Sequence, residues 1–186
     1  MTERSTVICG RLSEENFTPA SLDGFISRQE VTQCWRKRDG QWVLLPIAYI
    51  DACAPTAPAV LDALRAGNPA FGAWEGGQLA GLAILGRERF GSRGQYLDLA
   101  ELHVSQPLRG RGIGRTLFCM ACQEARSLGA QKLYISAHSA QETIAAYRAW
   151  GCVEAEEINW VLARKEPCDV QLEYALDGGA PATESF

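Results

Sequence analysis

The sequence predicts an α/β or α+β domain in which helices flank a central mixed, mostly antiparallel sheet, and three observations carry that prediction. Two apolar runs at 70–74 and 78–85 flank Glu75-Gly-Gly, which is typical of an antiparallel hairpin. Two units at 97–128 and 132–150 each combine a strand pattern with a helical one. Alternating segments at 153–161 and 168–176 predict final strands. Strands followed by strand–helix units form a sheet with helices on its faces.

Length and composition indicate one ordinary globular domain. The chain has 186 residues, of which 47% are hydrophobic and 22% charged. Its net charge of −4 argues against a nucleic-acid-binding surface as the main role. No apolar run approaches the roughly 18 residues of a membrane span, and the N-terminus lacks the apolar core of a signal peptide. We therefore expect a cytoplasmic protein.

The seven cysteines are scattered and do not predict a metal site. Cys119 and Cys122 form a Cys-x-x-Cys, but they fall inside a predicted helix and no second pair stands at zinc-ribbon spacing. The chain has only two histidines. We expect no metal, and cysteines that are mostly small buried residues in a reducing compartment.

The N-terminal part is harder to interpret. Residues 6–10 predict a first strand, and apolar residues at roughly helical spacing across 13–38 predict one or two short helices, capped at Thr18 or Ser21. Residues 41–53 are apolar but interrupted by Pro46, which favours an irregular segment or a short edge strand. A helix is expected at 56–66.

The glycine-rich turn between the strand at 97–104 and the helix at 113–128 predicts an anion site. Its residues are Arg109-Gly-Arg-Gly-Ile-Gly114. Glycines let backbone N–H groups approach a ligand, and the first helical turn has unpaired N–H donors. The spacing is neither Gly-x-Gly-x-x-Gly nor that of a Walker loop, which argues against dinucleotide and nucleotide-triphosphate sites. We expect the turn to bind a phosphate group.

These residues resemble a known family. Arg109-Gly-Arg-Gly-Ile-Gly fits Arg/Gln-x-x-Gly-x-Gly/Ala, the acyl-CoA pyrophosphate motif of the Gcn5-related N-acetyltransferase (GNAT) family. Glu142-Thr-Ile-Ala-Ala-Tyr-Arg-Ala-Trp-Gly-Cys resembles a second family signature, with Tyr147 on its tyrosine and Gly151 on its closing glycine. The resemblance is specific across about 70–155 and implies a GNAT-like acyl-CoA N-acyltransferase fold.

The resemblance implies a domain organisation and an activity. One domain would span 1–176, with a variable acceptor-side part at 1–69, an acyl-CoA-binding core at 70–155 and C-terminal strands at 156–176, before a loose tail at 177–186. The expected activity is acetyl transfer from acetyl-CoA to a primary amine of a small molecule or peptide, by direct attack in a ternary complex. The alternatives are a non-catalytic acyl-CoA-binding sensor, and an interaction module that binds another polyanion through its basic loop.

The resemblance also assigns residues to acetyl-CoA. The backbone of the strand would pair with the pantetheine arm, and the glycine turn would hold the pyrophosphate. The assigned residues are Leu102, His103, Val104, Arg109, Gly110, Arg111, Gly112, Ile113, Gly114, Arg115, Thr116, Ser139 and Thr143. Many family members have an asparagine where this chain has His138-Ser139, and Ser139 is the candidate donor there.

Catalysis would need a base and an acid. The base candidates are Asp98, Glu101, His103 and His138, of which Glu101 is preferred. Asp98 and Glu101 have opposite parity on the strand, so they face opposite sides of the sheet unless a bulge intervenes. Tyr147 is the candidate acid that protonates the departing CoA thiolate.

The acceptor site is the least defined. Its candidate residues are Trp35, Arg36, Trp42, Tyr49 and Asp51 in the N-terminal part, and Glu156, Glu157 and Trp160 near the C-terminus. The expected partners are acetyl-CoA and an amine-bearing acceptor, with no nucleic acid and no membrane. A homodimer is left open.

Overall fold

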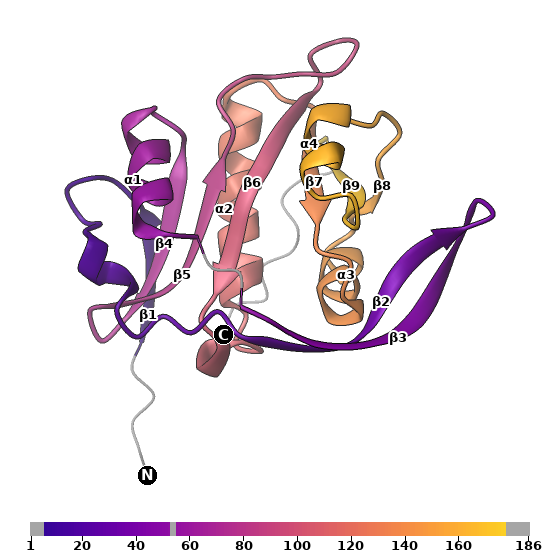
Figure 1. The fold of residues 1–186 in the computed structure, drawn as a ribbon. Helices are drawn as coiled ribbons and strands as arrows, with labels where there is room; N and C mark the ends of the chain where they lie inside the picture. Colours follow the sequence, from indigo (N-terminus) through magenta and orange to yellow (C-terminus); the bar gives the residue numbers. More distant parts are fainter. Residues whose placement is uncertain (1–5, 53–54, 178–186) are drawn as a thin grey trace.

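The computed structural model describes residues 6–52 and 55–177, and within them a seven-stranded sheet forms the centre of the molecule (Figure 1). The strands lie in the order β1-β4-β5-β6-β7-β9-β8. All neighbours are antiparallel except β6 and β7. The strands are β1 Val7–Arg11, β4 Ala70–Glu75, β5 Gln78–Leu85, β6 Tyr96–Val104, β7 Lys132–Ala137, β8 Val153–Glu154 and β9 Val170–Ala175. The predicted fold class is confirmed.

Helices cover both faces of the sheet (Figure 1). One face packs against α2 and α3, and their apolar side chains join Leu97, Leu99 and Leu133 in the main core. A second cluster packs Val60 of α1 against Leu82 and Ile84 of β5 on the opposite face. The helices are α1 Ala57–Arg65, α2 Ile113–Ser127, α3 Gln141–Ala149 and α4 Trp160–Lys165, with 3₁₀ turns η1 Pro19–Leu22 and η2 Gln106–Leu108.

The N-terminal part contains a long hairpin that the sequence analysis did not predict. The expected helix over 13–38 is wrong beyond η1, because β2 Gln29–Arg38 pairs with β3 Gln41–Asp51. Its apolar residues are buried by a tertiary contact, since Val31 and Cys34 pack against Ala140 before α3. Pro46 is tolerated because it lies beside a register shift in a strand that has only one partner.

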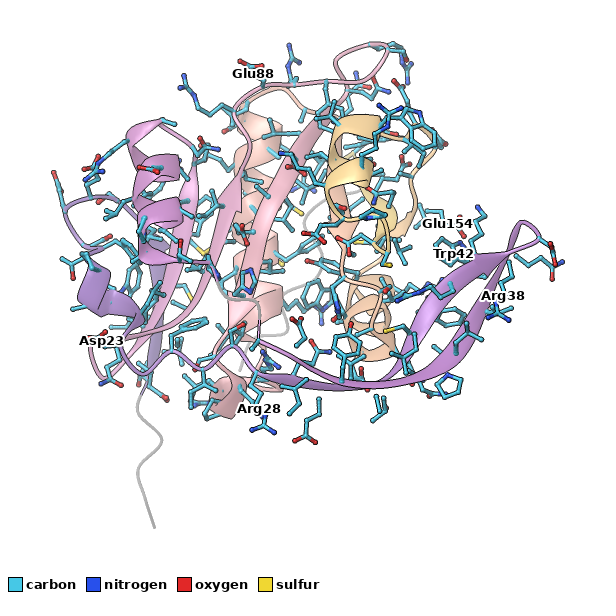
Figure 2. The ribbon with its side chains drawn as sticks, viewed as in Figure 1. Asp23, Arg28, Arg38, Trp42, Glu88 and Glu154 are labelled. Carbon is cyan, nitrogen blue, oxygen red and sulfur yellow. The ribbon has the colours of Figure 1, made fainter. Side chains whose placement is uncertain are left out.

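The outer half of this hairpin folds back onto the body of the protein. The ammonium group of Lys37 lies 3.9 Å from the carboxylate of Glu154 on β8 and 5.5 Å from the ring centre of Trp42. Figure 2 shows Trp42 and Glu154 close together. The Trp35 N–H donates a hydrogen bond to the Ser139 carbonyl. These contacts fix the hairpin beside α3.

The C-terminal region differs from the prediction in one element. The expected strand over 153–161 is only two residues long, because Asn159 starts the short helix α4. Its side chain accepts hydrogen bonds from the N–H groups of Val161 and Leu162, the usual role of an N-cap. The other predicted strands and helices from residue 56 to residue 176 are confirmed. The predicted loose tail lies outside the described residues from 178 onward.

None of the six cysteines that the structure describes forms a disulfide. Cys34, Cys119, Cys122 and Cys152 are buried, Cys9 is half-buried, and Cys168 is exposed. The expectation of small buried thiols therefore holds for four of them, and Cys53 lies outside the described residues. Burial raises the pKa of the Cys122 thiol to about 12, so this thiol stays protonated and unreactive within α2.

The feature that positions the site is the separation of β6 from β7. These strands pair only from Tyr96 to Asp98 on β6 and from Lys132 to Tyr134 on β7. Beyond that point β6 continues along β5, whereas β7 continues along β9. Within the described residues, Leu99–Val104 therefore pair with no strand on the β7 side. A gap opens between the two central strands.

A bulge lies at the start of this gap. Ile84 of β5 faces Glu101, whereas the next residue, Leu85, faces Leu99, so Ala100 is an extra residue in β6. A bulge reverses the alternation of side chains beyond it. Asp98 and Glu101 consequently share one face of the sheet, which resolves the alternative left open by the sequence.

Candidate active site

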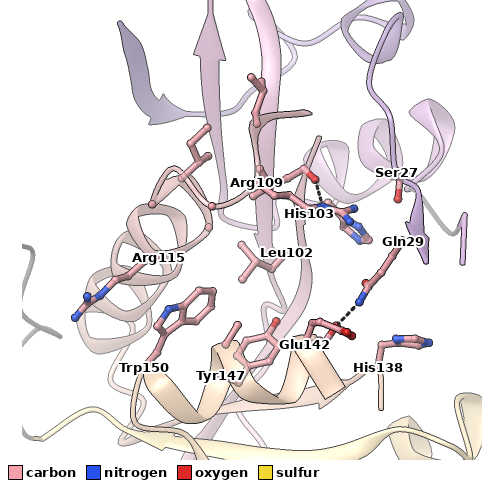
Figure 3. Close-up of a pocket in the computed structure, with 18 of the residues that line it drawn as sticks. Ser27, Gln29, Leu102, His103, Arg109, Arg115, His138, Glu142, Tyr147 and Trp150 are labelled. Atoms are coloured by element: carbon pink, nitrogen blue, oxygen red, sulfur yellow. Dashed lines mark hydrogen bonds between the residues drawn. The ribbon is translucent and has the colours of Figure 1, made fainter. Parts of the chain in front are cut away.

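A cavity of about 670 Å³ lies where β6 and β7 separate (Figure 3). One wall is the end of β6 and the glycine turn, and the other is α3. The start of β2 and the end of β3 close a third side. The predicted residues that line it are Asp51, Leu102, His103, Val104, Arg109, Gly110, Gly112, Ile113, Gly114, Arg115, His138, Thr143 and Tyr147. The fold thus brings most of the sequence-predicted residues together.

The glycine turn has the geometry of an anion cradle. Gly110 and Gly112 have φ angles of +74° and +79°, which non-glycine residues rarely adopt. A Cβ atom on Gly110 would meet no atom within 4 Å, so the space beside the backbone is open. Gly112 is the N-cap of α2, whose first N–H groups point toward the cavity end of the helix. A pyrophosphate group fits this combination of open space and N–H donors.

The three arginines of the turn have different contacts. Arg109 donates to the backbone carbonyls of Val104 and Arg28, at 3.0 and 2.9 Å, and joins the turn to the N-terminal segment. Arg111 forms a bidentate ion pair with Glu75 at the end of β4. Arg115 lines the cavity, and its Nε is buried without a partner in the described part of the chain. Of the three arginines, Arg109 and Arg115 line the cavity, and Arg111 does not.

At the other end of the cavity, β6 carries a carboxylate–imidazole pair. His103 Nε2 lies 2.7 Å from Glu101 Oε2. His103 lines the cavity, whereas Glu101 and Asp98 do not. Asp98 is largely enclosed near the Lys165 side chain of α4. Its burial raises its pKa to about 7, with Lys165 opposing and Glu101 adding to the shift.

The raised pKa of Asp98 predicts that the stability of the protein decreases with pH. In the folded state the carboxyl group keeps its proton from about pH 4 to about pH 7, whereas in the unfolded chain the same carboxyl group is deprotonated over this range. Stability from this group is complete at low pH and is lost as the pH rises through about 7. From about pH 5 to about pH 8, the wild type should lose about 2 kcal/mol relative to Asp98→Asn.

Urea unfolding of both proteins at these pH values checks this expectation. Asp62→Asn is the matched control, because Asp62 is an exposed carboxylate on α1. Its stability curve should follow that of the wild type. Parallel curves for the wild type and Asp98→Asn would contradict the buried, protonated carboxyl group.

Tyr147 forms the floor of the cavity beside Trp150 (Figure 3). Burial raises its pKa above the usual value of 10, so the hydroxyl is protonated at neutral pH. Its ring packs edge-on against Phe118 of α2 and against Trp150. The ring is therefore held in place by the core while it lines the cavity.

A second histidine of the cavity contacts the hairpin. His138, just after β7, has its Nε2 2.7 Å from the Tyr49 hydroxyl and 3.9 Å from the Asp51 carboxylate. Burial and the hydrogen bond with Cys34 raise the pKa of Tyr49 to about 12. Tyr49 and Asp51 were among the acceptor candidates, and Asp51 lines the cavity.

Other predicted residues lie elsewhere. Ser139 is buried and accepts a hydrogen bond from Arg36, and the Thr116 hydroxyl donates to the Gly112 carbonyl. Trp35 and Trp42 pack against the core. Near the C-terminus, Glu156 pairs with Lys132, Glu157 accepts from Ser92 and Gln95, and Trp160 is exposed. None of these side chains lines the cavity.

The sequence analysis also missed cavity residues. Gln29 and Glu30 belong to the hairpin, and Gln29 reaches the Thr143 hydroxyl at 3.5 Å across the cavity. Trp150 could have been found, because Thr143, Tyr147 and Trp150 recur at helical spacing on one face of α3. No local pattern marks Gln29 or Glu30.

Comparison with known proteins assigns the chain to a family. Residues 29–152, about two thirds of the sequence, match the family model described as "Acetyltransferase (GNAT) family". The chain belongs to the GNAT family. It is a GNAT-type N-acetyltransferase, and acetyl-CoA is its co-substrate. No curated protein sequence matches it.

Solved structures share the fold. A nourseothricin acetyltransferase has 17% identity and a TM-score of 0.69, covering 91% of this chain and 98% of that one. A putative streptothricin acetyltransferase from Bacillus anthracis, in complex with acetyl coenzyme A, has 13% identity and a TM-score of 0.65, covering 90% and 96%. An N-acetyltransferase from Staphylococcus aureus Mu50 has 16% identity and a TM-score of 0.58, covering 93% and 100%. The described part of the GNAT chain has no helix long and apolar enough to span a membrane.

Proposed function

We propose that this GNAT protein acetylates a primary amine of a small molecule or peptide, and that the amine attacks the thioester directly while both substrates are bound. The supporting observation is that a single cavity joins the glycine turn to the Glu101–His103 pair. Acetyl-CoA held by its pyrophosphate at the turn would extend along β6 toward this pair. The acceptor would approach from the hairpin side.

The residues assigned to acetyl-CoA have three separate roles. The N–H groups from Arg109 to Gly114 and the side chain of Arg115 would bind the pyrophosphate. The backbone of Leu102–Val104, which has no strand partner on the β7 side among the described residues, would pair with the amide groups of pantetheine. Thr143 of α3 would contact the same arm from across the cavity.

The acceptor amine requires a base. With a pKa near ~10.4, only about one amine in ~2,500 is neutral at pH 7, a deficit of roughly 4–5 kcal/mol. Glu101 would act as the base, either directly or through the His103 imidazole that is hydrogen-bonded to it. Asp98 lies on the same face behind them, and its carboxyl group keeps its proton up to about pH 7.

Tyr147 supports the departure of the CoA sulfur. Its hydroxyl is protonated at neutral pH, so it donates a hydrogen bond to the sulfur as the C–S bond breaks. The main core holds the ring at the floor of the cavity, below Leu102 (Figure 3). A fixed donor stabilises developing negative charge without rearrangement.

Acceptor choice would depend on residues 1–69. Support comes from the hairpin, which brings Gln29, Glu30 and Asp51 to the cavity. Residues 70–155 supply β6, the glycine turn and α3, and would form the acyl-CoA-binding core. Two acidic side chains on the acceptor wall favour a positively charged amine.

An amine panel tests the proposed function. CoA release from acetyl-CoA is followed with simple primary amines, peptides with a free N-terminus, lysine-containing peptides and nourseothricin, which is included because of the fold neighbour. We expect release with at least one acceptor, an N-acetylated product by mass spectrometry, and intersecting double-reciprocal lines. Parallel lines would contradict direct attack in a ternary complex.

The sensor alternative gives a different result. A non-catalytic acyl-CoA sensor would bind acetyl-CoA in a calorimetric titration but release no CoA with any acceptor. Absence of acetyl-CoA binding would contradict both interpretations and leave the basic turn as a site for another polyanion.

A further inference from the structure

The only two histidines of the 186-residue sequence both line the active-site cavity, and each lies near a carboxylate. His138 follows β7, and its Nε2 is hydrogen-bonded to Tyr49 of the hairpin. His103 lies on β6, at the gap along which acetyl-CoA is proposed to extend, with its Nε2 2.7 Å from Glu101. Imidazoles are the side chains best suited to proton transfer at neutral pH. Their concentration in one cavity points to proton transfer there.

His103 lines the cavity and is hydrogen-bonded to Glu101, which does not line it. The two residues are separated by one position beyond the bulge in β6, so their side chains project from the same face of the sheet. The side chains of His103 and Glu101 are 26% and 39% exposed, and of the two residues only His103 lines the cavity. An acceptor amine in the cavity would therefore meet the imidazole before the carboxylate.

The hydrogen bond determines which ring nitrogen is available. An ionised carboxylate can only accept, so Nε2–H of His103 donates to Glu101 and the lone pair of the neutral ring is on Nδ1. A base that is oriented in this way by a carboxylate is the arrangement used by many acyl-transfer enzymes. Glu101 also stabilises the imidazolium once the ring has taken a second proton.

We propose that His103 is the catalytic base of the acetyl transfer and that Glu101 is its positioning residue. This inference rests on the proposed function. The Nδ1 atom of His103 takes one proton from the ammonium group of the acceptor and later releases it to solvent. The amine nitrogen then forms a bond to the acetyl carbon, the C–S bond breaks, and the second N–H proton ends on the CoA thiol. The products are the N-acetylated amine, CoA and one free proton.

The charged groups around His103 are mixed. The acidic groups that face it across the cavity are Glu30 and Asp51 of the hairpin and Glu142 of α3, and the basic groups are His138, Arg109 and Arg115. Arg109 is already bonded to two backbone carbonyls. Glu101 is the group within hydrogen-bond distance of the His103 ring.

The kinetic test compares His103→Gln, His103→Ala and Glu101→Gln with the wild type, using an acceptor from the amine panel. We expect kcat to fall about 100-fold or more in both His103 variants, with acetyl-CoA affinity changed by less than about twofold. Added imidazole should restore part of the rate in His103→Ala and not in His103→Gln, where the cavity is still filled. A kcat within about threefold of wild type in either variant would overturn the proposal.

A spectroscopic test does not depend on turnover. With two histidines in the chain, a long-range ¹H–¹⁵N spectrum contains two imidazoles, and His138→Gln identifies that of His103. At neutral pH we expect the Nε2–H tautomer for His103, and a shift of the tautomer population in Glu101→Gln. A stable Nδ1–H tautomer would overturn the proposal even if both variants proved unstable.

The two tests separate the possible failures. If the wild type releases no CoA with any amine, the proposed function fails, and the tautomer still tests the His103–Glu101 pair. If the wild type is active and His103→Ala retains its rate, the assignment of the base fails and the proposed function stands.

Discussion

Replacing Gly112 by glutamate is expected to weaken acetyl-CoA binding at least about a hundredfold. The residue lies at the N-cap of α2 with a φ of +79°, in the turn that borders the cavity. A glutamate side chain here would put a negative charge against the pyrophosphate and displace the N–H donors. Hydrogen bonds to charged groups contribute about 1.5–3 kcal/mol each, so the loss of two corresponds to at least that change in affinity.

The matched control is Gly40→Glu. Gly40 has a φ of +80° at the tip of the β2–β3 hairpin, where a Cβ atom would meet nothing within 4 Å, and it does not line the cavity. Both substitutions impose a similar backbone strain, of about 1–2 kcal/mol. Calorimetric titration with acetyl-CoA should separate them. Equal affinities for the two variants would contradict the assignment of the turn.

Replacing Tyr147 by phenylalanine is expected to lower kcat about 100-fold while the dissociation constant of acetyl-CoA changes by less than about twofold. The substitution removes only the hydroxyl, and the ring contacts with Phe118 and Trp150 persist. An interaction made with the departing sulfur acts in the transition state, so its loss appears in kcat rather than in ground-state binding.

Tyr174→Phe controls for the loss of a tyrosine hydroxyl. Tyr174 belongs to the same aromatic cluster, with its ring centre 5.3 Å from that of Phe118, but it does not line the cavity. For both variants, kcat is measured by steady-state kinetics, and the dissociation constant of acetyl-CoA is measured by calorimetric titration. A kcat for Tyr147→Phe equal to that of Tyr174→Phe would remove the acid from the mechanism.

The backbone geometry of the glycine turn and the helix α3 could be predicted because their information is local. The glycine turn occupies six consecutive residues, and a left-handed backbone at Gly110 and Gly112 is something only glycine adopts readily. Tyr147 and Gly151 are fixed relative to each other by the period of α3. These features depend on short-range geometry, so the sequence pattern was sufficient.

The acceptor half depends on contacts between distant residues. The spacing of apolar residues in 29–38 fits a helix, and only pairing with 41–51 and burial against Ala140 make it a strand. The bulge at Ala100 is determined by the register of β6 against β5. None of these contacts leaves a local signal.

The gap between β6 and β7 also has a consequence for how such an enzyme can diversify. Side chains from both faces of β6 border one cavity, with Leu102 and Val104 on the α2 side and His103 on the other. Under the proposed function, donor and acceptor would contact opposite faces of β6. Substitutions at Glu30 or Asp51, which line the cavity on the hairpin side, would then change acceptor preference without touching the glycine turn. A new acceptor specificity could in this way evolve while the binding of acetyl-CoA stays unchanged.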